Sequence, residues 1–210
     1  MSKPIVFGEI EKFTEGHFFK NRKEMMLDGF HRKWAAGIDG NGNEGTSAIV
    51  LSGGYEDDED HGDEIIYTGA GGNSNSNKQI EDQSWKNIGN AGLLKSMDLG
   101  LPVRVIRGHN HKSPLSPKKK GYVYSGLYSV VDAWEEVGKS GFKICRFRLI
   151  YSGDNLQRKT PELTELDHST REKVRKKGVV IRIVRDSTIS NKVKNLYEYK
   201  CQICGISIKT

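Results

Sequence analysis

The sequence predicts an α+β fold that is mainly β, with a curved sheet or barrel flanked by helices and a short C-terminal α/β extension. Three observations lead to this prediction. Short runs rich in branched and aromatic residues recur through the first 153 residues, each bounded by Gly, Pro, Asn or Asp. Two helical patterns interrupt these runs. The composition, with 35% hydrophobic and 29% charged residues, is that of a folded domain rather than a disordered chain.

The expected elements follow in chain order. A first helix is expected at residues 21–27, before Gly29, and a longer one at 81–99, where Gly100 and Pro102 end it. Strands are expected at residues 48–51, 65–68, 103–107, 126–131 and 142–150. Because a closed or curled sheet protects its edges, we expect these strands to form a barrel or a strongly curved sheet.

The chain divides into three parts by composition. Residues 1–151 form the mainly β domain, residues 152–168 are a polar linker with Gly and Pro, and residues 169–210 are a basic extension. Residues 1–153 contain 20 Lys+Arg and 20 Asp+Glu, whereas residues 154–210 contain 13 and 7. The net charge of +6 therefore lies in the second part. Apart from the acidic cluster at 56–64, the first part is also net basic, and such a surface favours a partner that carries phosphates.

No membrane partner is expected. No window approaches the ~18 to 20 consecutive apolar residues of a membrane-spanning helix, and the N-terminal segment lacks the apolar core of a signal peptide. These observations predict a cytoplasmic protein.

The segment 52–69 places aromatic side chains beside carboxylates. Tyr55 and Tyr67 could hold a planar ring between them, and an Asp between them could accept hydrogen bonds from an exocyclic amino group. Gly53 and Gly54 would let a base approach the main chain. Two alternatives stay open at this point: the tyrosines are ordinary strand residues, and the acidic cluster at 56–64 is a solvated loop or a site for a divalent cation.

Several segments of the first part resemble the SET- and RING-associated (SRA) domain family, also called YDG. They are GIDGNGNEGTSAIVLSGGYEDDEDHGDEIIYTGAGG at 37–72, GFHRKWAAG before it, LPVRVIRG at 101–108 and YVYSGLYSVVDAWEEVGKSGFKICRFRL at 122–149. The Tyr-Asp-Gly signature is replaced by Tyr124-Ser125-Gly126. The resemblance implies an SRA-type curved β-barrel that extrudes 5-methylcytosine or 5-hydroxymethylcytosine from double-stranded DNA. It implies a base pocket made of Ser52, Gly53, Gly54, Tyr55, Asp58, Tyr67 and Thr68.

The same resemblance implies two loops that fill the gap left by the extruded base. One carries Asn77, Lys78 and Gln79, where Gln79 stands in place of the Arg with which vertebrate readers touch the opposite guanine. The other carries Trp34 and Ala35 as a wedge. For Trp34 the alternative is that it simply packs against the domain.

Basic residues outside the pocket are candidates for phosphate contacts, although such residues can equally form a solvated face. The histidines of His109-x-His111 are expected in a flexible loop, and His31 is expected to be structural. Cys145 lies on the apolar face of its strand and is expected to be a core thiol. The candidate phosphate contacts are Arg107, Lys112, Lys118, Lys119, Lys120 and Lys143.

The segment 185–205, RDSTISNKVKNLYEYKCQICG, resembles the entry to an HNH endonuclease module. Cys201 and Cys204 have the spacing of two zinc ligands, while a closed zinc site needs four. We expect a truncated module, no catalytic residue and no cutting by this chain, with zinc bound only in a complete module and no cofactor for the SRA part. The parent protein is expected to be a bacterial modification-dependent restriction endonuclease, acting at the nucleoid. An active nuclease, a protein-interaction scaffold and a homodimer remain open alternatives.

Overall fold

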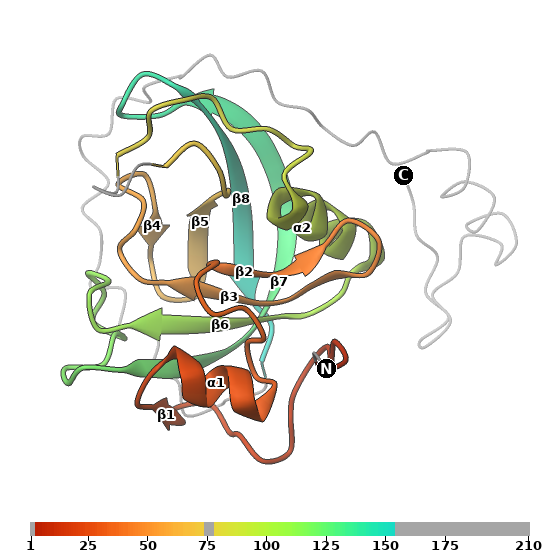
Figure 1. The fold of residues 1–210 in the computed structure, drawn as a ribbon, viewed down its shortest axis with the longest axis vertical. Helices are drawn as coiled ribbons and strands as arrows, with labels where there is room; N and C mark the ends of the chain where they lie inside the picture. Colours follow the sequence, from red (N-terminus) through yellow and green to blue (C-terminus); the bar gives the residue numbers. More distant parts are fainter. Residues whose placement is uncertain (1–2, 74–77, 154–210) are drawn as a thin grey trace, which may run out of the picture. The chain divides into compact units, whose positions relative to one another are not determined.

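The computed structural model describes residues 3–73 and 78–153. In these residues eight strands form one sheet, and two helices pack against it (Figure 1). The elements are β1 (Phe18–Phe19), α1 (Arg22–Asp28), β2 (Ile38–Asn41), β3 (Gly45–Leu51), β4 (Glu59–Asp60), β5 (Glu64–Thr68), α2 (Ile88–Leu99), β6 (Val103–Gly108), β7 (Tyr122–Val137) and β8 (Lys143–Tyr151).

The sheet is strongly curved and open. Its strands run in the order β2-β3-β6-β7-β8-β5-β4, with β1 paired to β7, and every pair is antiparallel except β3 and β6. The long strands β7 and β8 bend as they cross the molecule (Figure 1), and β7 has a register shift between Val130 and Asp132. The mainly β fold with two helices is confirmed. Within the described residues no ladder joins the end strands β2 and β4, so the sheet does not close into a barrel.

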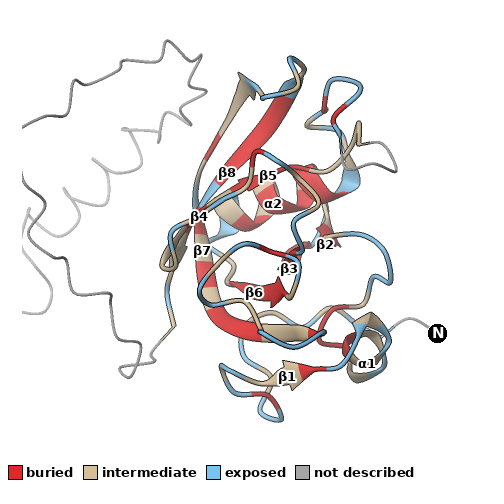
Figure 2. Ribbon diagram, turned by 90° about the vertical axis from the view of Figure 1, so that its left-hand side faces the viewer, coloured by how far each residue is buried: buried red, intermediate tan, exposed pale blue. Residues whose placement is uncertain are grey.

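Strand β3 is buried on both of its faces, which explains its continuous apolar run. Ile49 and Leu51 belong to a core cluster that includes Leu93 of α2, whereas Ala48 and Val50 belong to a second cluster with Met25 of α1. The alternation of side chains along a strand sends one set to each cluster. Figure 2 shows the buried residues concentrated in the central strands and on the inner side of α2.

The second helix is shorter than the sequence predicts. It begins at Ile88 rather than at residue 81, because the Asn87 side chain caps it by accepting a hydrogen bond of 3.0 Å from the Gly89 N–H. The preceding residues are bound to β8 instead: Gln83 N donates to Lys143 O at 2.8 Å, and Gln83 Oε1 accepts from Cys145 N at 3.0 Å. These bonds hold Gln83 against β8, and a turn closed by the 3.0 Å bond from Asn87 N to Ser84 O leads into the helix.

No helix within residues 3–73 and 78–153 is long and apolar enough to cross a membrane. The predicted linker beyond Gly153 and the basic extension 169–210 lie outside the described residues.

Candidate nucleotide-binding site

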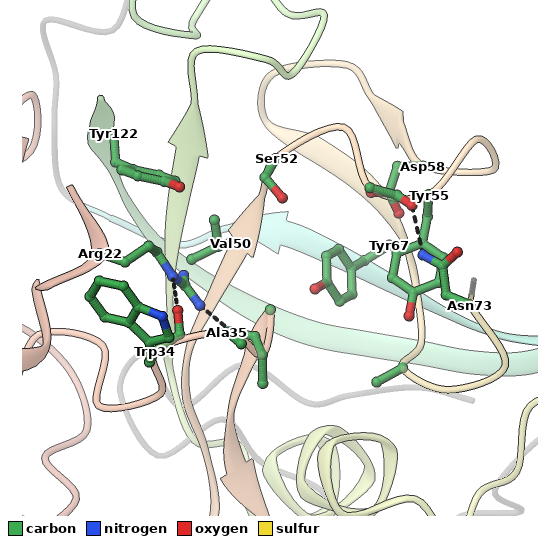
Figure 3. A pocket seen from close by; sticks show the side chains of 14 residues that line it. Arg22, Trp34, Ala35, Val50, Ser52, Tyr55, Asp58, Tyr67, Asn73 and Tyr122 are labelled. Atoms are coloured by element: carbon green, nitrogen blue, oxygen red, sulfur yellow. Dashed lines mark hydrogen bonds between the residues drawn. The ribbon is translucent and has the colours of Figure 1, made fainter. Parts of the chain in front are cut away.

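A cavity of about 410 Å³ opens where β3, β5, α1 and three loops meet (Figure 3). A volume of this size is at the lower end of the range for small-molecule pockets. The cavity brings together five of the seven predicted pocket residues, which are Ser52, Gly54, Tyr55, Asp58 and Tyr67, and two of the predicted wedge loop, which are Trp34 and Ala35. It is completed by Arg22, Ala36, Gly37, Val50, Ala70, Asn73 and Tyr122.

The two tyrosines reach the cavity from different elements. Tyr67 lies on β5, paired with Phe147 of β8, and its side chain is buried. Tyr55 lies in the loop after β3, half-buried, and its hydroxyl accepts a hydrogen bond of 3.3 Å from the Gly71 N–H. Burial raises the pKa of both tyrosines, so both remain protonated at neutral pH. At Gly37 a Cβ would lie 2.8 Å from the Tyr67 hydroxyl, so any larger residue there would displace that hydroxyl.

Asp58 supplies the carboxylate of the cavity. Its Oδ1 accepts a hydrogen bond of 2.8 Å from the Thr68 N–H, and the carboxylate lines the cavity. Burial raises the pKa of Asp58 to about 6, although the hydrogen bonds from Thr68 oppose this shift. At pH 7 the group is therefore mostly ionised and acts as an acceptor. Thr68 itself is buried behind Asp58 and accepts a 2.8 Å bond from Arg146.

The predicted glycine pair has two different roles. Gly54 lines the cavity, and its carbonyl accepts a 2.9 Å bond from Asn73 Nδ2. Gly53 has a φ of +73°, and a Cβ there would lie 2.7 Å from Asn110 O. Gly53 thus packs against the neighbouring loop and shapes the turn that presents Tyr55, and it does not line the cavity.

At the centre of the acidic cluster 56–64, Asp60 is not solvated but bound to other side chains. Asp60 is buried, accepts two bonds of 2.7 Å from Arg107, and lies 2.8 Å from His111 Nε2. Burial alone would raise the pKa of Asp60, but the hydrogen bonds from Arg107 and His111 hold it far below its usual range. The acids of this segment mostly serve internal contacts.

Two sequence predictions are corrected by this cluster. Arg107 was predicted to contact phosphate, but its side chain is fully buried and bound to Asp60, so it faces no solvent. The prediction is wrong because β6, like β3, is buried along its whole length. The loop with His111 was predicted to be flexible, whereas the His111 side chain is bound to the buried carboxylate of Asp60.

The prediction for the gap-filling loop with Asn77, Lys78 and Gln79 is also corrected in part. Gln79 is buried, and its Nε2 donates to Gly71 O at 2.9 Å and Glu81 O at 2.7 Å. It therefore holds its own loop together and does not point toward a partner base. Lys78 is exposed, and Asn77 lies outside the described residues.

The wedge loop and most of the predicted phosphate-binding lysines are exposed. Trp34 is 59% exposed on the rim of the cavity, which speaks against the alternative that it simply packs. Lys119 lies 4.0 Å above the Phe18 ring, and Lys143 lies 3.8 Å from Glu135. Contacts of these residues with DNA remain predictions, as they do for Lys112, Lys118 and Lys120, which are also exposed.

Two structural roles predicted from the sequence are confirmed. His31 is buried, and its ring nitrogens lie 3.1 Å from Lys33 O and 3.2 Å from Gly37 O. Burial lowers its pKa to about 4, so it stays neutral. Cys145 is a buried free thiol of the core.

In the part of the chain that the structure describes, no group of three or more His, Cys, Asp or Glu side chains is arranged to hold a metal ion. The predicted zinc ligands Cys201 and Cys204 lie outside this part.

Sequence reasoning missed half of the cavity wall. Arg22 at the start of α1 and Tyr122 at the start of β7 are separated by a hundred residues, and the pairing of β1 with β7 and the core packing of Met25 against β7 bring these segments together. Val50 was predicted only as a residue of the strand at 48–51. The one local signal for Arg22 is its position directly after the Asn21 helix cap.

The fold and the cavity define a class of protein: a domain with a strongly curved, open sheet and a cavity lined by two tyrosines and a carboxylate. A family model described as the SAD/SRA domain matches residues 6–155, and the chain belongs to this family.

Similar proteins carry this domain as part of longer chains. The chain is 43% identical over 152 residues to the histone-lysine N-methyltransferase family member SUVH2 of Arabidopsis thaliana, covering 69% of this chain and 23% of the relative. It is 38% identical over 165 residues to the E3 ubiquitin-protein ligase UHRF1 of Xenopus laevis, covering 68% and 21%. The chain thus spans about a quarter of the length of the curated relatives it matches.

Two solved structures are similar in fold and sequence. A modification-dependent TagI restriction endonuclease is 40% identical with a TM-score of 0.66, and the match covers 97% of this chain and 66% of that chain. The SUVH5 SRA domain bound to fully hydroxymethylated CG DNA is 38% identical with a TM-score of 0.60, covering 70% and 95%.

Proposed function

We propose that this protein recognises 5-methylcytosine or 5-hydroxymethylcytosine in double-stranded DNA by extruding the base into the cavity. The observation that carries the proposal is the convergence of Tyr55, Tyr67 and Asp58 on that one cavity. A base inside a duplex could not reach these groups, so recognition requires that the base leave the stack.

The geometry of the cavity accounts both for affinity toward an extruded base and for the preference for cytosine over thymine. The tyrosine rings offer faces on which a base can stack, worth about 1 to 3 kcal/mol per base, against an unstacking cost of a few kcal/mol. The ionised carboxylate of Asp58, which lines the cavity, would accept from an exocyclic amino group, which cytosine has at N4 and thymine lacks. Exposed lysines and the wedge loop would add sequence-independent contacts to the duplex.

The comparisons support this assignment. The family is one whose SUVH5 member has been solved with methylated and with fully hydroxymethylated DNA, and the TagI enzyme is modification-dependent by name. These ligands belong to the relatives. They support the proposal for this chain because the cavity residues are present here in one pocket.

A competition assay tests the proposal. Identical duplexes carrying cytosine, 5-methylcytosine or 5-hydroxymethylcytosine at one position compete for the protein at about 150 mM salt, where phosphate-only binding is weakened. We expect at least a tenfold preference for a modified duplex, loss of that preference in Tyr55→Ala, and its retention in Tyr55→Phe, which keeps the ring. Equal binding of all three duplexes would contradict the proposal, as a protein-interaction scaffold predicts.

The match to TagI along almost the whole chain supports a second, broader proposal: the domain is the targeting part of a restriction system against modified DNA. Incubation of the 210-residue protein with Mg²⁺ and methylated or plain plasmid tests it. We expect binding of the methylated plasmid without cleavage. Modification-dependent cleavage would assign the nuclease to this chain itself.

A further inference from the structure

The carboxylate of Asp58 is supported by a side chain that does not line the cavity. Arg146 lies on β8 opposite Thr68 of β5, and it is buried. Its Nη1 donates to Thr68 Oγ1 at 2.8 Å and to Asp57 O, and its Nη2 donates to Glu59 Oε1 at 2.9 Å. One guanidinium therefore binds the residue before Asp58, the residue after it and the residue that donates to it.

The Thr68 hydroxyl passes this contact on to Asp58. A hydroxyl has a single hydrogen, so an oxygen that accepts from Arg146 still has that hydrogen to donate to another group. Its acceptor is Asp58, which receives hydrogen bonds from both the N–H and the hydroxyl of Thr68. Arg146 thus fixes the direction in which the Thr68 hydroxyl points, and both hydrogen bonds favour the ionised carboxylate.

The outer side of the same guanidinium faces carboxylates at the protein surface. Its Nε lies 3.0 Å from Glu136 Oε1, and the side chains of Glu59 and Glu136 are 54% and 36% exposed. These acids remain hydrated whether or not Arg146 is present, so they do not require a buried cation. A purely structural role for Arg146 would be to fasten the acidic segment to β8, whereas a role in the site requires that it act on Asp58.

We propose that Arg146 is a positioning residue of the cavity, which holds the Asp58 carboxylate in place as the acceptor for the extruded base through Thr68 and the two neighbours of Asp58. The inference rests on the proposed function, because it concerns the group that would bind the cytosine amino group. Arg146 does not line the cavity, so its removal should leave the cavity walls in place and make Asp58 a poorer acceptor.

The first test uses the free protein and needs no DNA. With isotope-labelled aspartate in the 210-residue chain, NMR follows the titration of the Asp58 carboxyl. Burial raises the pKa of Asp58 to about 6, and the loss of a nearby cation or of a hydrogen bond to the ionised form raises it further. We expect titration at higher pH in Arg146→Met and in Thr68→Val, which keeps the shape of threonine without its hydroxyl. Arg148→Met, which removes an exposed arginine from the same strand, should leave the titration unchanged.

Other charged or titratable groups also border Asp58, and they are the same in all of these variants. They are His111 from the loop after β6, Tyr55 from the loop after β3 and Tyr67 from β5. A difference between the variants and the wild type therefore reports the contacts of Arg146 and Thr68.

The second test connects this titration with recognition. Affinity for the modified duplex is measured from pH 6.0 to pH 8.5. Because Asp58 must be ionised to accept from the amino group, the affinity lost by Arg146→Met should be at least about threefold larger at pH 6.0 than at pH 8.5. In the Asp58→Asn background, Arg146→Met should change affinity by the same factor at both pH values. Arg146→Lys keeps the charge without the fork of the guanidinium and should restore part of the wild-type pH profile.

The outcomes separate the role of Arg146 from the proposed function. Unchanged titration of Asp58 in both Arg146→Met and Thr68→Val would overturn the inference. An affinity loss of equal size at every pH would also overturn it, because a merely structural role predicts that result. If thermal unfolding shows that Arg146→Met does not fold, Thr68→Val and Arg146→Lys decide the question by the same measurements. Shifted titration in a protein that does not prefer the modified duplex would support the contact between Arg146 and Asp58 and refute the proposed function.

Discussion

The substitution Asp58→Asn should stabilise the free protein while it weakens recognition. A carboxyl whose pKa rises from 3.8 to about 6 on folding costs about 3 kcal/mol of stability at pH 7, because the folded state holds the charged form poorly. Water in the open cavity screens part of this charge, so we expect a gain of about 1 to 3 kcal/mol. Asn keeps an oxygen that accepts from the Thr68 N–H.

The stability gained by Asp58→Asn should be present at neutral pH and should decrease as the pH falls. Between pH 3.8 and about 6 the folded protein binds more protons at Asp58 than the unfolded chain, so wild-type stability from this group rises as pH falls. Below this window Asp58 is neutral in both the folded and the unfolded state. The Asn variant is then no longer more stable than the wild type. The difference in free energy of unfolding between the two proteins is therefore present at pH 7.5 and absent near pH 3.5.

Urea denaturation of both proteins at several pH values measures this difference, and the competition assay on the same samples measures recognition. The amide of Asn would turn its donor toward the cytosine amino group or leave Thr68 N unpaired, so the preference for a modified duplex should fall at least tenfold. The reasoning would be refuted if Asp58→Asn were less stable than the wild type at pH 7.5. It would also be refuted if the gain in free energy of unfolding were equal at pH 7.5 and pH 3.5.

Four further outcomes are expected. In the Asp58→Asn background, the neutral buried His31 should make stability fall by up to about 3 kcal/mol as pH decreases from 6.5 to 4, seen by urea denaturation; a flat profile would contradict this. Asp60→Ala should leave Arg107 buried without its partner and cost about 3 to 5 kcal/mol, measured by thermal unfolding; a change below 1 kcal/mol would contradict it. Gly53→Ala should cost about 1 to 3 kcal/mol through its positive φ and the clash with Asn110, and an unchanged melting temperature would disprove the strain. Affinity for DNA should fall steeply between about 50 and 200 mM salt, while the ratio for modified over plain duplex changes less than tenfold; parallel loss of both would refute the separation of phosphate and pocket contacts.

The sequence predicts the base end of the cavity because its signals are local. Tyr55, Asp58 and Tyr67 come from one segment of thirteen residues in which a turn, an acidic run and a short strand follow each other, and their meeting in one cavity follows from that hairpin. Strands β3, β5, β6, β7 and β8 were also predicted from local signals, because each contains a continuous run of branched and aromatic residues.

The other end of the cavity depends on contacts between distant segments, which periodicity does not show. Arg22 and Tyr122 meet through the β1–β7 pairing and the packing of α1 on β7, and β1 has just two residues. Arg107 misled the prediction because an arginine in an alternating strand normally faces water, whereas its partner Asp60 arrives from a strand 47 residues earlier. Gln79 misled it because a loop polar residue can bond its own loop as well as a partner.

Extrusion of the base into the cavity is the central claim, and fluorescence of a neighbouring base tests it most directly. A duplex carries 2-aminopurine beside the modified cytosine, whose fluorescence rises when that neighbour leaves the stack. We predict that saturating wild-type protein raises the fluorescence of the modified duplex severalfold and leaves that of the plain duplex unchanged. Tyr55→Ala should raise the fluorescence of neither duplex. Tight, selective binding of the modified duplex with no rise in fluorescence would show that the base stays stacked, and would contradict the account.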